Sequence, residues 1–281
     1  MIDSLPLDDR AMSTFERDAK IGLLATIDPD GLPHLSLITS LQAKAPDRLM
    51  FGQFCEGWSK KHLLANPRSA FLVMNENKEL WRGQARWVGR QGSGEDYELY
   101  NHKPMFRYNS YFGIHTVHYL DLVRFRGAER LAMLPVAAGS FAASVLGRFA
   151  RRGAASPVLK PWASRLVSQT STLKFLAWVA EDGYPVIVPV VPSIAVQARR
   201  IVFVPSVYRD ELNAIPPGRS VAVFALNLQM ESVLVRGEFT GYRRYAGIKA
   251  GAIEIDWVYN SMPPKPGPIY PVKTLTPIET F

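Results

Sequence analysis

Apolar and polar positions alternate in short runs along most of the chain, a pattern that predicts β-strands rather than helices. Such runs in the first half cover residues 21–27, 35–41, 49–53 and 70–74. In the second half they cover 175–180, 186–191, 200–204, 221–226 and 232–242. Asp30-Gly31 separates the first two runs, and this dipeptide is a strong signal for a tight hairpin turn. Antiparallel strands of this length and spacing favour a barrel or a sandwich.

Short motifs recur along the chain at a nearly constant offset. Asp30-Gly31-Leu32-Pro33 returns as Asp182-Gly183-Tyr184-Pro185, and Leu49-Met50-Phe51 as Ile201-Val202-Phe203, each 152 residues later. Two shorter echoes pair Arg68-Ser69 with Arg219-Ser220 at 151 residues and Arg82-Gly83 with Arg236-Gly237 at 154. Four echoes in the same order predict a duplicated domain.

The segment between the two copies differs in composition from both. Residues 130–174 contain no Asp or Glu but seven Lys or Arg, together with many small residues. We therefore expect a first barrel over 1–130, a basic and partly helical linker over 131–173, and a second barrel over 174–281. The Pro-rich stretch 263–268 should run extended. A solvated connector is favoured over a nucleic-acid site for the basic linker, because no RNA-binding aromatic motif accompanies the charge.

Composition limits the partners and the compartment. The 281 residues carry 33 Lys and Arg against 25 Asp and Glu, a net charge of +8 that favours anionic partners. The single cysteine, Cys55, allows no intrachain disulfide and suits a reducing cytoplasm. One Cys and five scattered His give no zinc-ligand spacing. The apolar run 131–147 is short and rich in Ala, so we expect a cytoplasmic protein without a membrane span.

The clearest candidate for chemistry is a short helix over 58–65, which Asn66-Pro67 should end. Its start carries Ser59, Lys60 and Lys61. Helix N-termini offer free N–H groups and the positive end of the helix dipole, and both favour phosphate. The alternative is that the two lysines belong to a solvated helix face. The sequence contains neither a phosphate loop of the G-x-x-x-x-G-K type nor a G-x-S-x-G nucleophile elbow.

Several motifs in order resemble the FMN-binding split β-barrel family related to pyridoxamine 5′-phosphate oxidase. The matching residues lie between about 18 and 125, and they are Gly22-Leu23-Leu24-Ala25-Thr26, Asp30-Gly31-Leu32-Pro33-His34, Ser59-Lys60-Lys61, Asn66-Pro67 and Gln84-x-Arg86-x-x-Gly89. The resemblance implies a mainly β fold of two tandem split barrels that binds FMN. It implies cofactor contacts from the strand after the hairpin turn, from the end of the next strand, from the helix start and from a later strand: Ser36, Leu37, Ile38, Thr39, Ser40, Gln53, Ser59, Lys60, Lys61 and Gln84.

A segment rich in aromatic and His residues, 97–121, follows these motifs. It suggests a substrate pocket wall in which Tyr108 or His115 could hold or protonate a substrate, and a packed flap with a strand is the alternative. At the position of the phosphate segment the second copy has Tyr208-Arg209-Asp210-Glu211, whose carboxylates would repel a phosphate. We therefore expect the second barrel to be degenerate.

The combined expectation is an FMN-dependent oxidoreductase whose substrate and catalytic residues the sequence leaves open. A non-catalytic flavin or haem protein, such as a sensor, is one alternative, and an F420-dependent reductase is another. Split barrels of this family usually dimerise, so we expect either a homodimer or a pseudo-dimer of the two copies within one chain. Trp257-Val258-Tyr259 would then form a wall of the flavin pocket, unless Trp257 is simply core of the second barrel.

Overall fold

The chain folds into two compact units, seen here in a computed structural model. The structure describes residues 6–54, 57–103, 113–131, 156–190, 192–245, 247–260 and 267–271. One unit comprises residues 1–131 with 179–187, and the other comprises 132–178 with 188–281. Residues 132–155 of the expected linker and residues 263–266 of the expected Pro-rich stretch lie outside the described residues. The domain limits given above therefore stay a prediction. Among the described residues no helix is long and apolar enough to cross a membrane.

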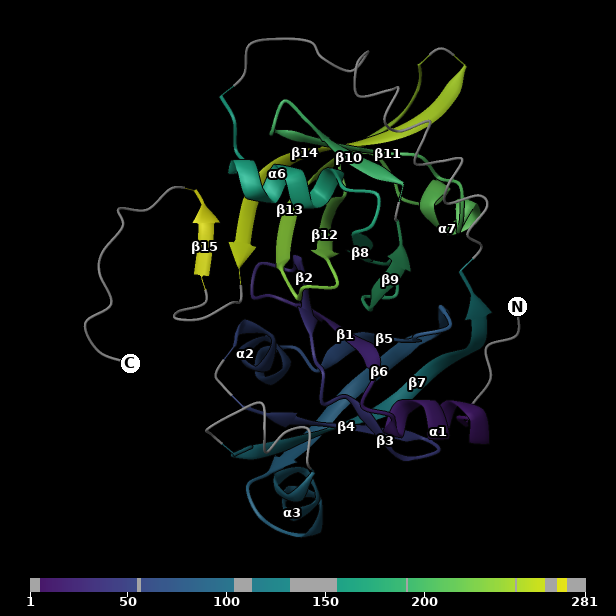
Figure 1. Cartoon of the computed structure of the whole chain (residues 1–281), viewed down its shortest axis with the longest axis vertical. Coiled ribbons are helices and arrows are strands. Elements are labelled where there is room, and N and C mark those ends of the chain that lie inside the picture. Colours follow the sequence, from purple (N-terminus) through teal and green to yellow (C-terminus); the bar gives the residue numbers. More distant parts are fainter. Residues whose placement is uncertain are drawn as a thin grey trace, which may run out of the picture. The chain divides into compact units, whose positions relative to one another are not determined.

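The described residues of the first unit form a seven-stranded antiparallel sheet and the helices α1, α2 and α3 (Figure 1). Its strands follow the order β2-β1-β5-β6-β7-β4-β3. In chain order its elements are α1 (Asp9–Glu16), β1 (Lys20–Ile27), β2 (Pro33–Leu37), β3 (Gln42–Ala45), β4 (Arg48–Gln53), α2 (Trp58–Ala65), β5 (Arg68–Asn75), β6 (Glu79–Gln91), α3 (Glu95–His102) and β7 (Thr116–Arg130).

The sheet of the second copy repeats this plan, although residues 179–187, at the end of β8 and the start of β9, are counted with the first compact unit. Its strands follow the order β10-β11-β14-β13-β12-β8-β9, and β15 pairs with β14 in addition. Its elements are α6 (Pro161–Ser168), β8 (Leu173–Val179), β9 (Pro185–Pro189), β10 (Ser193–Val196), β11 (Arg200–Phe203), α7 (Arg209–Asn213), β12 (Ser220–Leu226), β13 (Ser232–Tyr245), β14 (Ile248–Asn260) and β15 (Gly267–Tyr270). Read in chain order, the two sheets have the same topology. The predicted fold class, mainly β with two tandem split barrels, is therefore confirmed.

Strand register fixes which residues of the two copies are equivalent. Ala70 lies opposite Gln84 in the first sheet, and Ala222 lies opposite Arg236 in the second, so Gln84 and Arg236 are equivalent. The sequence echo that matched Arg82 with Arg236 is therefore wrong by two residues. The echo of Arg68 with Arg219 is wrong by one, because the strand offset is 152 here as well. Dipeptides of common residues recur by chance, whereas the four-residue turn motif marks the true equivalence.

The predicted hairpin turns are present in both copies with the same backbone. Gly31 and Gly183 each have φ of +78°, a left-handed conformation that glycine adopts without steric cost. In each copy the amide of this glycine donates to the carbonyl three residues earlier, of Asp28 or Ala180. The same local sequence thus starts the β1–β2 and β8–β9 hairpins.

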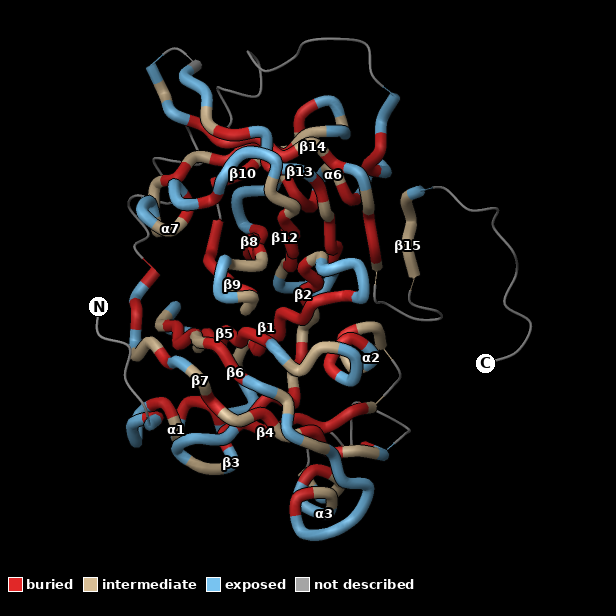
Figure 2. Tube along the Cα trace, turned by 180° about the vertical axis from the view of Figure 1, so that it is seen from behind, coloured by how far each residue is buried: buried red, intermediate tan, exposed pale blue. Residues whose placement is uncertain are grey.

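The core of the first unit lies inside its curved sheet, where buried side chains concentrate (Figure 2). Phe15 of α1 packs edge-to-face on Phe71 and Trp81, with ring centroids 6.1 and 6.2 Å away. Leu63 of α2 joins the same cluster. Both helices therefore contribute side chains to the barrel core.

The return strand after the first hairpin is shorter than the sequence predicted. The prediction covered 35–41, but β2 ends at Leu37, and the chain turns over residues 38–41. The Ile38 amide donates to the carbonyl of Gly22 at 2.7 Å, and the Ser40 hydroxyl is 2.8 Å from the carbonyl oxygen of Gly52. This turn joins β1 to β4 and closes the barrel, which is why the strand does not continue.

The two copies differ most between their last two long strands. In the first unit, residues 92–115 separate β6 from β7 and include α3. In the second unit, only residues 246 and 247 separate β13 from β14. The segment rich in aromatic and His residues is thus an addition specific to the first copy.

Candidate functional site

Polar side chains gather where α2 covers one end of the first barrel. His62 of α2 has its Nδ1 3.2 Å from Thr26 Oγ1 of β1. The His62 ring stands edge-on to His34 at 4.9 Å, and Trp58 stacks on His34 at 6.3 Å. His62, His34 and Thr26 are all buried, although this end of the barrel joins the apolar core. Buried polar groups cost free energy unless they are satisfied, so such a concentration marks a candidate site.

The start of α2 carries a cationic side chain next to its N-cap. Its N-cap, Gly57, is extended and supplies no side-chain hydrogen bond to the helix. The Lys60 ammonium folds back over this turn, and its Nζ stands 3.3 Å from the point where a side chain on Gly57 would begin. A cation at the positive end of a helix dipole is unfavourable by itself, and a bound anion reverses that sign. Ser59 is buried beside it, whereas Lys61 is exposed.

Three further side chains form a hydrogen-bonded row across β4, β7 and β6. Trp87 Nε1 lies 3.2 Å from His118 Nδ1, and His118 Nε2 lies 2.7 Å from Gln53 Oε1. His118 is fully buried and stacks on Phe51 with ring centroids 4.8 Å apart and planes 3° from parallel. Gln53 ends β4 and is also buried. The row therefore closes the barrel core on the side from which the chain runs into α2.

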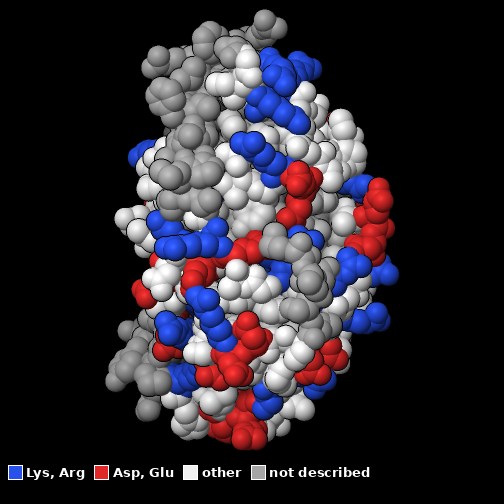
Figure 3. Space-filling model, turned by 90° about the vertical axis from the view of Figure 1, so that its right-hand side faces the viewer, with Lys and Arg blue, Asp and Glu red and all other residues white. Residues whose placement is uncertain are grey.

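The electrostatic surroundings of His118 are positive. Burial, and after it the charges of Lys60, Arg90 and His115, lower the pKa of His118 to about 4. Lys60 comes from α2 and Arg90 from β6, so cations approach this end of the barrel from two elements. On the face of the molecule that Figure 3 draws, positive and negative side chains are interspersed over much of the surface.

The structure brings some of the predicted cofactor residues together. Lys60 of α2 lies close enough to His118, the hydrogen-bond partner of Gln53, for its charge to act on that ring, and Ser59 precedes it on the same helix. His115 adjoins Gln53, because its backbone amide donates to the Gln53 carbonyl at 3.2 Å. His115 is exposed, with Nδ1 2.8 Å from Thr116 Oγ1. Tyr108 and Cys55 lie outside the described residues.

Other predicted residues lie elsewhere or have other partners. Ile38 belongs to the buried core, and Ser36, Leu37 and Thr39 are half-buried near the barrel closure. The Ser40 hydroxyl is engaged with both the amide and the carbonyl of Gly52, at 3.1 and 2.8 Å. Ser40 thus joins the turn to β4 by two hydrogen bonds. Its role in cofactor binding stays a prediction, as do those of its neighbours.

Gln84 is separated from the α2 end along the sheet. It lies opposite Arg124 of β7, whereas Gln53 lies opposite Thr116 of the same strand. Eight residues of β-strand correspond to roughly 26 Å. Gln84 is buried, and its neighbour Ala85 belongs to the barrel core, so alternation points Gln84 to the opposite face of the sheet. The structure of the first unit therefore does not place Gln84 and Gln53 around the same part of a ligand.

Sequence reasoning missed His118, Trp87, His62 and Thr26 as site residues. A signal for His118 was present, because it continues the inward-facing positions Leu120 and Leu122 of β7. A histidine in such an apolar stripe needs hydrogen-bond partners inside the protein. Those partners come from distant strands, so their identity required the fold.

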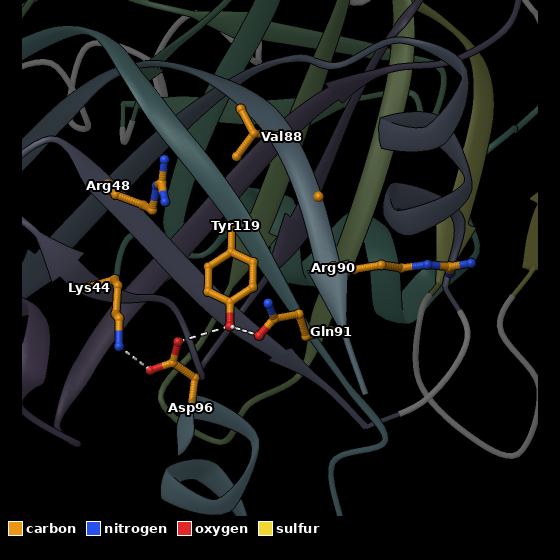
Figure 4. Close-up of a pocket in the computed structure, with 8 residues that line it drawn as sticks. Lys44, Arg48, Val88, Arg90, Gln91, Asp96 and Tyr119 are labelled. Carbon is orange, nitrogen blue, oxygen red and sulfur yellow. Dashed lines mark hydrogen bonds and ion pairs between the residues drawn. The ribbon is translucent and has the colours of Figure 1, made fainter. Parts of the chain in front are cut away.

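A cavity of about 420 Å³ lies on the outer side of this sheet, between α3 and strands β3, β4, β6 and β7 (Figure 4). Tyr119 donates a hydrogen bond to Asp96 of α3 at 2.8 Å, and Lys44 pairs with the same carboxylate. Burial and Asp96 raise the pKa of Tyr119 to about 12, so its hydroxyl keeps its proton. These side chains point toward one another, whereas Arg90 points away from the cavity. The network holds α3 against the sheet.

The second copy lacks the polar row. By strand register, His118 corresponds to Gly251, and the space beside Gly251 is filled by the ring of Phe203. Trp87 and Gln53 correspond to Phe239 and Pro205, at the strand offset of 152. The helix equivalent to α2 is α7, which is only five residues long and has Asp210 and Glu211 in its first turn. The equivalent end of the second barrel is thus apolar and bears acidic residues at its helix.

Comparison with known proteins gives no match to a family model and none to a curated protein. Solved structures with similarity include an FMN-binding protein from Syntrophomonas wolfei, at 14% identity over 44% of this chain and 86% of that one, with a TM-score of 0.38. An F420 reductase matches at 17% identity over 43% of this chain and 98% of its own, with a TM-score of 0.35. HupZ of Group A Streptococcus matches at 12% identity over 42% and 91%, with a TM-score of 0.36. Each of these likenesses spans less than half of this chain and does not define its ligand.

Proposed function

We propose that the first barrel binds a flavin-type cofactor, FMN or the deazaflavin F420, at the end covered by α2, and that the protein is an oxidoreductase. The observation that carries this proposal is the Lys60 ammonium folded over the start of α2, beside the buried Ser59. Backbone N–H groups, a hydroxyl and an ammonium are the donors that a phosphate group requires. The motif order that resembles FMN-binding split barrels supports the same assignment.

The residues at this end fit a flavin in their chemistry. Lys60 and the first turn of α2 would hold the phosphate, and the carboxamide of Gln53 would hydrogen-bond an acceptor atom of the ribityl chain or the ring. The polar barrel end would orient the cofactor and exclude water. When bound, the flavin supplies the hydride chemistry, so the protein needs to bind and orient rather than to provide a reactive group.

Haem is a weaker candidate at this place. An axial ligand would have to be an imidazole nitrogen or a similar group. Both nitrogens of His118 are engaged, one with Trp87 and the other with Gln53, so a haem ligand would have to come from another histidine, such as the exposed His115. The absorbance spectrum of the purified protein distinguishes FMN, deazaflavin and haem, and a haem spectrum would overturn the proposal.

We infer that only the first copy binds the cofactor and that the second serves as its partner barrel, in place of the second subunit of a dimer. The apolar, acidic character of the equivalent end in the second copy supports this division. Cofactor content and the mass of the full chain in solution test it. A single flavin per chain in a monomer is expected, and two flavins per chain would contradict it. A homodimer would favour pairing between copies of the first barrel.

The sharpest test of the phosphate site compares two neighbouring lysines. Lys60→Glu should weaken FMN binding by about tenfold or more, because it places a carboxylate where the phosphate is expected. Lys61→Glu changes the net charge equally, but its side chain is exposed, so it should have a small effect. Riboflavin, which lacks the phosphate, should bind both variants and the unchanged protein alike. Equal losses in the two variants, or equal losses for FMN and riboflavin, would show that the phosphate lies elsewhere.

A further inference from the structure

The row of Trp87, His118 and Gln53 has a defined direction. The indole N–H of Trp87 can only donate, so the Nδ1 of His118 that receives it must carry a lone pair. A neutral imidazole then has its proton on Nε2, which donates to Gln53 Oε1 at 2.7 Å. The burial of His118, which disfavours the charged form, keeps the ring in this neutral state.

This direction determines which end of the Gln53 carboxamide is left for a ligand. Its oxygen is occupied by His118, and its nitrogen has no hydrogen-bond partner among the described residues. Gln53 is only 4% exposed, so an amide nitrogen with two donors stands almost buried beside the start of α2. This nitrogen is not among the fully enclosed polar atoms without a partner, so it keeps a small opening through which a ligand acceptor can reach it.

We propose that Trp87 and His118 are positioning residues, which fix the Gln53 carboxamide so that its N–H groups face the cofactor. This inference rests on the proposed function and adds to it a rule about the ligand. The ligand atom contacted by Gln53 must be a hydrogen-bond acceptor, such as a flavin carbonyl oxygen, a ring nitrogen or a ribityl oxygen. A ligand that presents a donor there would require Gln53 to turn its oxygen toward the ligand and its nitrogen toward His118. His118 would then have to carry its proton on Nδ1, where it would face the indole N–H of Trp87.

The second copy supports this interpretation by contrast. Phe239, Gly251 and Pro205 occupy the equivalent positions, and the rings of Phe203 and Phe239 lie 5.9 Å apart in their place. Replacement of all three members of the row by residues without side-chain hydrogen bonds shows that the barrel core does not require them. The row is therefore tied to something that the first copy does and the second does not.

The test removes only the indole donor. Trp87→Phe keeps an aromatic ring but frees His118 Nδ1, so the histidine can place its proton on that nitrogen. Gln53 can then turn round and donate to Nε2, which presents its oxygen to the ligand. We expect about tenfold weaker binding of FMN and of riboflavin at neutral pH, the size of one lost hydrogen bond. Trp81→Phe is the matched control, because Trp81 lies in the same core and its indole nitrogen has no hydrogen-bond partner among the described residues.

Acidification gives a readout that a purely structural defect would not show. Protonated His118 carries a proton on both nitrogens and again donates to Gln53, so riboflavin affinity of Trp87→Phe should recover as the pH falls. The charged or titratable groups that act on His118 are Lys60 from α2, Arg90 from β6 and His115 beside β7. Trp81→Phe retains all three groups, so their contribution can be subtracted.

Nitrogen-15 NMR of the imidazole groups tests the row without any ligand. The unchanged protein should show His118 as the Nε2–H tautomer at neutral pH, and Trp87→Phe should show loss of that single form. A Trp87→Phe variant with unchanged tautomer, unchanged affinity and no recovery in acid would overturn the positioning role. Failure of the unchanged protein to bind any flavin would instead overturn the proposed function, and the ligand rule with it.

Discussion

Arg82 of β6 and Glu129 of β7 form an ion pair through two nitrogens and both carboxylate oxygens, at 3.1–3.2 Å. Their side chains are only 5% and 7% exposed. The energetic value of such a pair depends on both partners, because its desolvation cost is offset only while the opposite charge is present. The stability of the first unit should therefore be sensitive to the loss of either partner.

Glu129→Gln should lower the free energy of unfolding of the first unit by about 3–5 kcal/mol, because it removes the carboxylate charge that offsets the buried Arg82 guanidinium. Asp121→Asn is the control, since the Arg48–Asp121 pair is exposed and should contribute less than about 1 kcal/mol. Urea unfolding of both variants measures the difference. Similar small losses in the two would show that the Arg82 pair is hydrated in solution.

Lys174 of the second unit should make stability rise in alkaline solution. Its ammonium is buried and donates to the carbonyl oxygens of Gln169 and Ser193, at 2.8 and 3.3 Å. Burial lowers the pKa of Lys174 to about 8, from 10.5 in the unfolded chain. Between these two values the unfolded state binds more protons, so stability increases with pH from about 8 to 10.5.

The slope of stability against pH in that window should be smaller in Lys174→Met. Lys20 of the first unit, whose pKa burial also lowers to about 8, keeps part of the slope in both proteins. Lys160→Met, which changes an exposed lysine of the same unit, should leave the slope as it is. Identical slopes in Lys174→Met and in the unchanged chain would argue that the Lys174 ammonium is solvated.

Gly83 should tolerate no side chain. A Cβ at this position would lie 2.1 Å from the carbonyl oxygen of Arg124 on the neighbouring strand, and 2.9 Å from the ring of Phe71. Gly83→Ala should therefore destabilise the first unit by about 1–3 kcal/mol or more. Gly127→Ala is the control, because a Cβ there would meet only Phe125, at 3.9 Å. The thermal midpoints of the two variants provide the comparison.

The duplicated fold was within reach of the sequence, and the reason is local. The Asp-Gly turns and the alternating runs depend on neighbouring residues, so the β1–β2 and β8–β9 hairpins could be predicted directly. The echo of Arg82 with Arg236 failed, because β-bulges and strand register are set by partners far away in the chain. The break in the strand at Ile38 likewise depends on Gly22, which it meets only in the closed barrel.

The candidate site was predictable only in part. Ser59 and Lys60 belong to one motif, and the fold keeps them together at the start of α2. The partners of Gln53 come from strands that lie far from it in sequence, so no spacing rule could have found His118 or Trp87. The physical clue was a histidine in an apolar stripe, which indicates a buried network but not its members.

His118 should make the first unit lose stability in mild acid. Its pKa is lowered to about 4 by burial and by the neighbouring cations, whereas an unfolded histidine titrates near 6.5. Between these values the unfolded chain binds the extra proton, so stability falls as the pH drops from 6.5 toward 4. This one group accounts for about 2–4 kcal/mol of the loss.

His118→Phe keeps a ring stacked on Phe51 but cannot titrate, so its unfolding midpoint should vary less over the same range. His115→Phe is the control, because His115 is exposed and its removal should leave the acid loss in place. If the acid loss persisted in His118→Phe and disappeared in His115→Phe, His115 and not His118 would be its origin, and the prediction would be wrong. That result would also mean that folding does not lower the pKa of His118.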